Sequence, residues 1–159
     1  MKLLTLLLSA VGLSAQPITS DFINRVAIVE SNFNYDAVGD KGLARGAWQL
    51  HEAAYIDALK WYEFCNAQDQ NGFVVCIESR PWKECATDPY ISRVVATYYF
   101  KLLEHKFKLR GINPTHLQLY MAYNMGFARA SQFKFDPYTY ELPSKSYAIL
   151  RRAELIICK

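Results

Sequence analysis

The sequence predicts one predominantly α-helical domain, on three observations. Apolar residues recur at helical spacing over several segments. No two neighbouring segments alternate convincingly between apolar and polar residues, as paired strands do. The chain has 159 residues, 52% of them hydrophobic and 14% aromatic, which is enough for one compact core and too little for two ordinary domains.

The first predicted helix ends at Glu30. Thr19 or Ser20 can cap it, and Asp21 favours its positive end. Its apolar positions have helical spacing: Phe22, Ile23, Val26 and Val29. Because the residues just before Glu30 are apolar, we expect a partly desolvated carboxyl with a raised pKa, which stays protonated and can act as an acid near neutral pH.

The middle of the chain combines a loop, a helix and an irregular segment. Residues 31–46 are rich in Asn, Asp and Gly, which predicts a long loop that can shape a cleft. Helical spacing returns from Ala47 to about Tyr62. Residues 65–89 have no sustained period and contain three of the four cysteines, so we expect an irregular excursion there.

Three helices are predicted in the last part of the chain. The longest runs from Pro89 to Leu109 on a strict i, i+3, i+4 apolar pattern. Asn113 and Pro114 resemble the cap and first residue of a helix that reaches about Tyr123. The last helix covers residues 144–157.

The four cysteines favour two disulfides if the chain is exported. They are Cys65, Cys76, Cys85 and Cys158. Their spacing lacks the close pairs of a zinc site and the three histidines stand apart from them, so no metal site is expected. Free buried thiols are the alternative.

Residues 1–15 are typical of a signal peptide, with Lys2 before an apolar run and small residues up to Ala15. We therefore expect a secreted or periplasmic protein whose mature domain covers residues 16–159. The apolar run is shorter than the roughly 20 residues that cross a bilayer, so no membrane anchor is expected after cleavage. The net charge of +3 comes without a basic cluster, which makes nucleic acid a poor partner.

Three short motifs occur in order along the chain. They are Glu30-Ser31 followed by Phe33 and Ala37, then Gly46-Ala47-Trp48-Gln49, then Ala122-Tyr123-Asn124-Met125-Gly126. Together they resemble the motifs of soluble lytic transglycosylases, enzymes of the lysozyme-like superfamily. The motif-bearing region runs from about residue 21 to residue 127. Trp48 departs from the family, which usually has Met there, and residues 62–89 match nothing in the family.

The resemblance implies a lysozyme-like α-helical domain with a substrate cleft that binds peptidoglycan glycan strands. Glu30 would be the catalytic acid, with Tyr123 and Asn124 beside it. Ser31 and Gln49 would contact or position the substrate. No cofactor is implied, and we expect a monomer.

The resemblance further implies cleavage of the β-1,4 bond between N-acetylmuramic acid (MurNAc) and N-acetylglucosamine (GlcNAc), with 1,6-anhydromuramoyl ends as product. Two other functions stay open: a hydrolysing muramidase that uses Asp40 as a second carboxylate, and a secreted glycan-binding protein without activity. For Trp48, sugar stacking and a place in the core remain equal alternatives.

Overall fold

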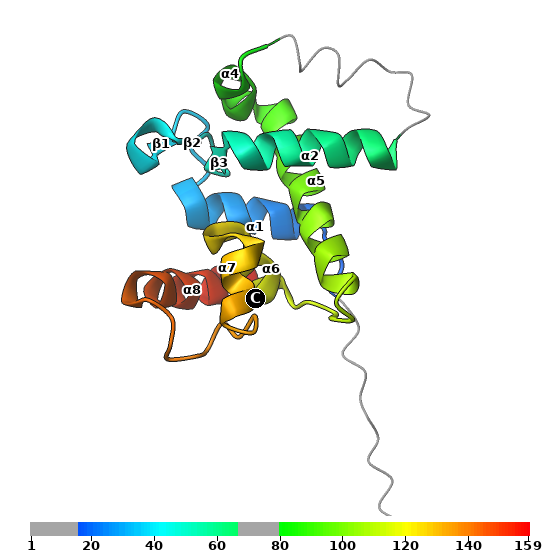
Figure 1. Cartoon of the computed structure of the whole chain (residues 1–159). Helices are drawn as coiled ribbons and strands as arrows, with labels where there is room; N and C mark the ends of the chain where they lie inside the picture. The colour runs from blue at the N-terminus through cyan, green and yellow to red at the C-terminus, as the bar shows by residue number, and fades with distance from the viewer. Residues whose placement is uncertain (1–15, 67–79) are drawn as a thin grey trace, which may run out of the picture.

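The structure is a computed structural model that describes residues 16–66 and 80–159. The predicted signal peptide and Cys76 lie outside these residues. The described helices are α1 (Ser20–Ser31), α2 (Glu52–Cys65), α4 (Trp82–Thr87), α5 (Pro89–Lys108), α6 (His116–Met125), α7 (Phe127–Gln132) and α8 (Ser144–Ile157). The predicted mainly α-helical fold is confirmed (Figure 1).

Helix α1 forms as its sequence predicts. The Thr19 hydroxyl accepts a hydrogen bond from the Phe22 amide at 3.1 Å, which caps the first turn. The apolar side chains at helical spacing are buried against the rest of the core. The helix ends where Asn32 adopts a left-handed conformation, with φ of 56°, and its amide bonds back to the carbonyls of the last turn. This end places Glu30 beside the other helices.

A small antiparallel sheet occupies part of the segment predicted as a loop. Its strands are β1 (Val38–Gly39), β2 (Ala44–Arg45) and β3 (Leu50–His51), paired in that order. The prediction that a helix begins at Ala47 is therefore wrong, because α2 begins only at Glu52. Gly46 and Gln49 have φ of 73° and 48°, which an α-helix does not accommodate.

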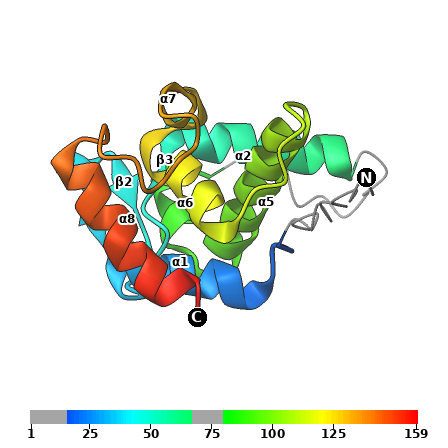
Figure 2. The same ribbon diagram turned by 90° about the horizontal axis from the view of Figure 1, so that it is seen from below.

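Helix α6 lies at the centre of the domain. Its residues are apolar on all sides of the helix, which is typical of a helix that is packed all round. Figure 2 shows it between α5 and α8, with α1 running beneath. It begins two residues later than expected, because Thr115 forms a capping box with Gln118 that outcompetes a start at Asn113.

The segment after Gly126 was not predicted as helical, yet α7 begins directly behind this glycine. Gly126 has φ of 85°, so it ends α6 and turns the chain into the next helix. The turn brings α7 against α6 (Figure 2).

Helix α5 agrees with the predicted helix at residues 89–109. Asp88 caps it by accepting hydrogen bonds from the amides of Tyr90 and Ile91, at 3.0 and 2.9 Å. Among the described helices, neither this one nor any other is both long and apolar enough to cross a membrane.

The excursion at residues 65–89 is partly helical in its described part. Helix α4 occupies Trp82–Thr87, and its backbone lies against the turn between β2 and β3. A Cβ atom on Gly46 would stand 1.8 Å from the carbonyl oxygen of Ala86. The sheet and α4 therefore need glycine at this point to pack.

The cysteines do not form the predicted pair of disulfides. Cys65 and Cys158 are free thiols in the structure, and Cys76 lies outside the described residues. Because two bridges would use all four cysteines, the free Cys65 and Cys158 contradict the two-disulfide prediction. A domain that buries this many apolar side chains does not need covalent cross-links to fold.

Alkylation without reductant should therefore label Cys65 and Cys158, which are exposed, and spare Cys85, which is fully buried. Partial burial raises the pKa of the Cys158 thiol, so it should react more slowly than Cys65 near pH 8. Peptide mass spectrometry after iodoacetamide treatment reads each site. Labelling of Cys65 and Cys158 only after reduction would contradict the free thiols at these two positions.

Candidate active site

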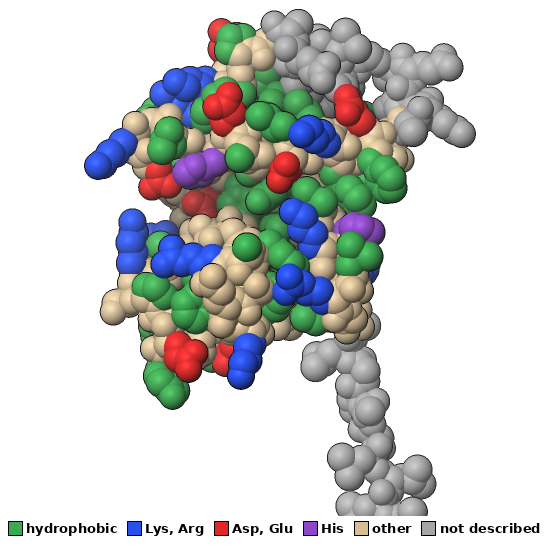
Figure 3. All heavy atoms as spheres, viewed as in Figure 1, with side chains coloured by type: hydrophobic (Ala, Val, Ile, Leu, Met, Phe, Trp, Pro, Cys, Tyr) green, Lys and Arg blue, Asp and Glu red, His purple; other side chains and the backbone are tan. Residues whose placement is uncertain are grey.

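A pocket of about 360 Å³ lies between the small sheet, the end of α1 and helices α6 to α8. Figure 3 shows the surface hollowed between the part that contains the sheet and α2 and the part that contains α7 and α8. The polar and charged residues that line this pocket are Glu30, Asp40, Gln49, His51, Tyr123, Asn124, Arg129, Lys145 and Ser146. Four of the predicted site residues thus meet in one place with Glu30: Asp40, Gln49, Tyr123 and Asn124.

Glu30 occupies the last turn of α1, where it lines the pocket and is half-buried. Its Oε1 atom accepts a hydrogen bond of 2.7 Å from the hydroxyl of Tyr120, on α6. The guanidinium of Arg152, on α8, donates to the neighbouring Val29 carbonyl at 3.2 Å. Three helices therefore fix the position of one carboxyl group.

Burial raises the pKa of Glu30 above its ordinary value, and this desolvation is the largest effect on the group. Hydrogen bonds from Tyr120 and Asn124 and the charge of Arg152 lower the pKa, and the charge of Asp40 raises it. Since burial outweighs the donors, the carboxyl keeps its proton to a higher pH than an exposed glutamate. The raised pKa that the apolar residues before Glu30 predicted is therefore confirmed.

Tyr120 is a site residue that the sequence analysis missed. Burial raises its pKa, and the charge of Glu30 raises it further, so the phenol stays neutral and remains a hydrogen-bond donor. The residue lies one turn before Asn124 on α6, so both side chains face Glu30. This i, i+4 spacing was the signal in the sequence, but Tyr120 stands outside the third motif.

Tyr123 lines the pocket, but its hydroxyl has another partner. It donates a hydrogen bond to the carbonyl oxygen of Trp48. The hydroxyl that contacts Glu30 is that of Tyr120, whereas the resemblance placed Tyr123 beside the acid. The bond of Tyr123 joins α6 to the turn before β3, so this residue connects the two walls of the pocket.

Trp48 belongs to the core rather than to the pocket surface. Its side chain is fully buried, and its indole N–H donates to the Ile23 carbonyl at 2.9 Å. Its ring packs edge-on against Phe33 and Tyr35. No face of the indole is left for a sugar, which favours the core alternative.

Gln49 is held in the pocket by the backbone around it. Its Nε2 atom donates to the Gly46 carbonyl at 2.9 Å, and its own φ of 48° is in the left-handed region. A Cβ atom on Gly39 would lie 2.0 Å from Oε1 of Gln49. The glycine therefore leaves room for the amide, and such a constrained conformation is frequent at functional sites.

Ser31 does not line the pocket, although it was expected to contact substrate. Its hydroxyl donates to the Ala47 carbonyl at 2.8 Å and accepts from the Asn34 amide at 2.9 Å. These bonds tie the end of α1 to the turn before β3. Ser31 therefore holds backbone segments next to the pocket in place and does not contact the pocket itself.

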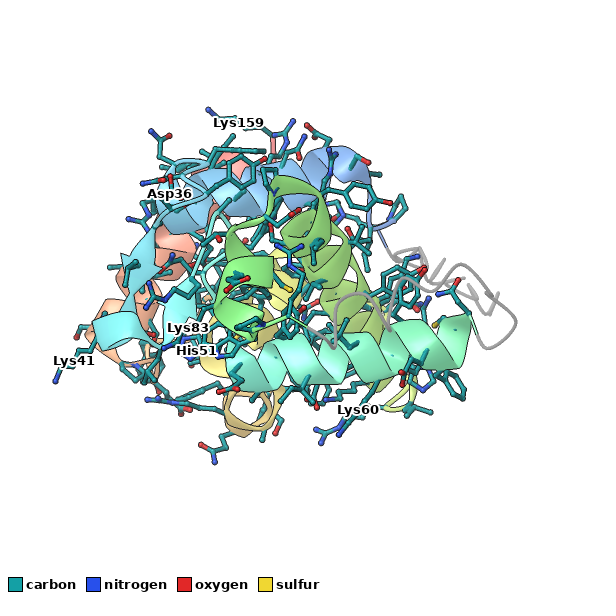
Figure 4. All side chains as sticks on the ribbon, turned by 90° about the horizontal axis from the view of Figure 1, so that it is seen from above. Asp36, Lys41, His51, Lys60, Lys83 and Lys159 are labelled. Carbon is teal, nitrogen blue, oxygen red and sulfur yellow. The ribbon has the colours of Figure 1, made fainter. Side chains whose placement is uncertain are left out.

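Asp40 lines the same pocket as Glu30, in the turn between β1 and β2. Its Oδ2 atom lies 3.0 Å from Nε2 of His51, and its side chain is 61% exposed. Figure 4 shows His51 at the start of α2. Asp40 thus meets Glu30 across the pocket as an exposed carboxylate with a partner of its own.

The described residues contain no group of three or more His, Cys, Asp and Glu side chains that could hold a metal ion. The donors in the pocket are hydroxyl, amide and carboxyl groups together with three cationic or imidazole side chains. Such a set suits proton transfer and hydrogen bonding to a polar polymer.

A helical domain with a half-buried carboxyl acid in a polar pocket has the architecture of lysozyme-like, glycan-cleaving proteins. The family model of the transglycosylase SLT domain matches residues 12–141 of the chain. The chain therefore belongs to the transglycosylase SLT family, whose members act on peptidoglycan. Neither the curated proteins nor the solved structures include a significant match.

The raised pKa of Glu30 predicts a pH-dependent gain in stability for Glu30→Gln. Between the ordinary pKa of 4.5 and the raised folded value, the folded protein holds a proton that the unfolded chain has lost. The free energy of unfolding of the wild type therefore falls as pH rises through this interval, and that of Glu30→Gln does not. Melting temperatures from pH 4 to 8 measure the difference. The exposed Glu63→Gln serves as control, and a constant difference for Glu30→Gln would contradict the raised pKa.

Tyr120→Phe should change the pKa of Glu30, whereas Tyr123→Phe should change the free energy of unfolding. Tyr120→Phe removes a hydrogen bond that lowers the pKa of Glu30, so this pKa should rise further. Tyr123→Phe should leave the pKa of Glu30 nearly unchanged and lower the free energy of unfolding by about 1 kcal/mol, because the Trp48 carbonyl loses its donor. Carbon NMR titration and urea unfolding measure the two quantities. A larger change in the pKa of Glu30 in Tyr123→Phe than in Tyr120→Phe would contradict Tyr120 as the hydrogen-bond partner of Glu30.

Proposed function

We propose that the protein is a lytic transglycosylase that cleaves the MurNAc–GlcNAc β-1,4 bond of peptidoglycan, with Glu30 as its one catalytic carboxyl. The observation that carries the proposal is the half-buried Glu30, whose pKa is raised and whose oxygen accepts the Tyr120 hydroxyl at the wall of the pocket. A carboxyl that keeps its proton to a higher pH than an exposed glutamate is suited to protonate the departing sugar oxygen.

In the first step, the Glu30 proton passes to the glycosidic oxygen as the bond to C1 of MurNAc breaks. The N-acetyl carbonyl oxygen of the same sugar attacks C1 and stabilises its positive charge as an oxazolinium ion. Glu30 is then a carboxylate. The Tyr120 hydroxyl, the Asn124 amide and the charge of Arg152 stabilise this ionised form, since each lowers the pKa of the group.

In the second step, Glu30 takes the proton of the C6 hydroxyl, and O6 attacks C1. The bond from C1 to the N-acetyl oxygen breaks, so a 1,6-anhydro ring forms and the acid is regenerated. No water is consumed. One carboxyl performs both proton transfers because its hydrogen bonds hold it in place in either state.

The other pocket residues have positioning roles in this proposal. Asn124 and Gln49 carry amides that can hold the N-acetyl groups and hydroxyls of the glycan. Tyr123 lines the pocket while its hydroxyl fixes the Trp48 carbonyl. We place the domain at residues 16–159, acting as an exported monomer on peptidoglycan strands.

A hydrolysing muramidase is the second candidate, because Asp40 lines the same pocket and its charge acts on Glu30. As a second carboxylate it would activate water against C1. Its exposure and its contact with His51 favour the single-carboxyl mechanism. A binding protein without activity is the third candidate, and the burial of a titrating carboxyl in the pocket argues against it.

Glu30→Gln should reduce glycan cleavage by at least about 100-fold with the fold intact, because the variant keeps the shape of the side chain and loses its proton. Mass spectrometry of muropeptides from wild-type digestion should give 1,6-anhydro ends, and Asp40→Asn should give the same product.

Each other outcome selects another candidate. Hydrated ends that vanish in Asp40→Asn would establish the muramidase. If the wild type gives no cleavage products, the glycan-binding protein without activity is the candidate function that remains. A folded Glu30→Gln variant with a tenth of the wild-type rate or more would remove Glu30 from the mechanism.

A further inference from the structure

The pocket that contains Glu30 continues into a second pocket of about 240 Å³. The two share the residues Gln49, His51, Tyr123 and Asn124, so together they form one groove. We name the part with Glu30 the acid half and the part beyond the shared residues the neutral half. A groove of two joined parts suits a linear polymer better than a single small molecule.

The two halves differ in charge. The neutral half adds small and aromatic side chains to the shared residues: Leu50, Ala53, Ala54, Tyr99 and Gly126. The acid half adds two cations from two different helices, Arg129 on α7 and Lys145 on α8. Figure 3 shows Lys and Arg side chains just below the hollow, and a His, acidic side chains and further Lys and Arg side chains above it. The charge of the groove therefore changes along its length.

Arg129 and Lys145 have no anionic partner in the described part of the chain. The ion pairs there involve other cations, such as Arg25 with Asp21 and Lys108 with Glu104. The first turn of α8 contains no acidic residue and no side-chain cap that would compete for Lys145. Both cations are exposed to solvent at the pocket, so an anionic ligand can reach them.

These cations do not serve to set the pKa of the acid. The cation whose charge acts on Glu30 is Arg152, which is also anchored to the Val29 carbonyl. Neither Arg129 nor Lys145 contributes to that pKa. Their positive charge at the pocket is thus available for a ligand.

We propose that Arg129 and Lys145 bind a carboxylate carried by the substituent of the muramic sugar that occupies the acid half, so that the enzyme selects strands with acidic substituents over neutral glycans. This inference rests on the proposed function. Muramic acid differs from the other sugar of the strand by its lactyl group, which ends in a carboxylate or continues into an acidic peptide. An uncharged sugar would occupy the neutral half.

The physical reason for this selectivity is the strength of charge-assisted hydrogen bonds. A guanidinium and an ammonium from two helices can hold one carboxylate from two directions. The same charges make no such bond with the uncharged GlcNAc. The selectivity between the two kinds of strand therefore comes from the substituent that the sugar in the acid half carries.

Binding in the Glu30→Gln background tests the proposal without turnover. The ligands are peptide-bearing glycan strands, amidase-stripped strands that keep the lactyl carboxylate, and neutral chitohexaose. Calorimetry compares Arg129→Gln/Lys145→Gln with the matched control Lys60→Gln/Lys83→Gln. The control pair is exposed on α2 and α4 and makes the same change in net charge (Figure 4).

We expect the Kd of Arg129→Gln/Lys145→Gln for peptide-bearing strands to rise about tenfold, and its affinity for chitohexaose to stay within twofold of the background. A similar rise with stripped strands would identify the lactyl carboxylate as the ligand. A rise with peptide-bearing strands alone would identify the peptide.

Three results would overturn the inference: no change with either acidic strand, an equal loss in the control pair, or an equal loss with chitohexaose. Failure of the Glu30→Gln protein itself to bind any glycan would instead overturn the proposed function. Circular dichroism of each variant verifies that the substitutions leave the fold intact.

Discussion

The burial of one carboxyl group at the end of α1 is the constraint on which the site depends. A glutamate in water would ionise well below neutral pH, and only the surrounding helices raise its pKa. A buried carboxyl without partners would be costly, so Tyr120 and Asn124 supply donors and Arg152 supplies charge. Residues from α1, α6 and α8, far apart in the chain, therefore have to meet at Glu30. The helical core holds an acid in this state at the edge of a pocket.

Helix α6 connects the stability of the fold to the chemistry of the site. It packs at the centre of the domain, and one of its faces carries Tyr123 and Asn124 at the pocket and the buried Tyr120 against Glu30. The bond from Tyr123 to the Trp48 carbonyl joins this helix to the turn before the sheet. The fully buried indole of Trp48 fixes the same turn against α1. The two walls of the pocket are thus held by contacts that also belong to the core.

The residues around the acid come from inside and outside the region that matches the family. The family match covers residues 12–141, and α8 begins after it. Arg152 and Lys145 both come from α8, one beside the acid and the other at the open part of the pocket. The acid and its motif partners belong to the matched region, and the charges around them come in part from a helix outside it. Specificity of this kind depends on the particular residues of a site rather than on the fold that carries them.

The sequence by itself determined the helical class and the catalytic candidate. Apolar spacing sufficed for α1, α5 and α8, since each presents one apolar face, and the ordered motifs singled out Glu30. Only the tertiary structure decided which tyrosine contacts the acid, because Tyr120 and Tyr123 both lie within a turn of Asn124 and their partners come from distant segments. It also decided that Trp48 is buried and that Cys65 and Cys158 are free. These are long-range contacts, and a local pattern of residues does not specify which surfaces will meet.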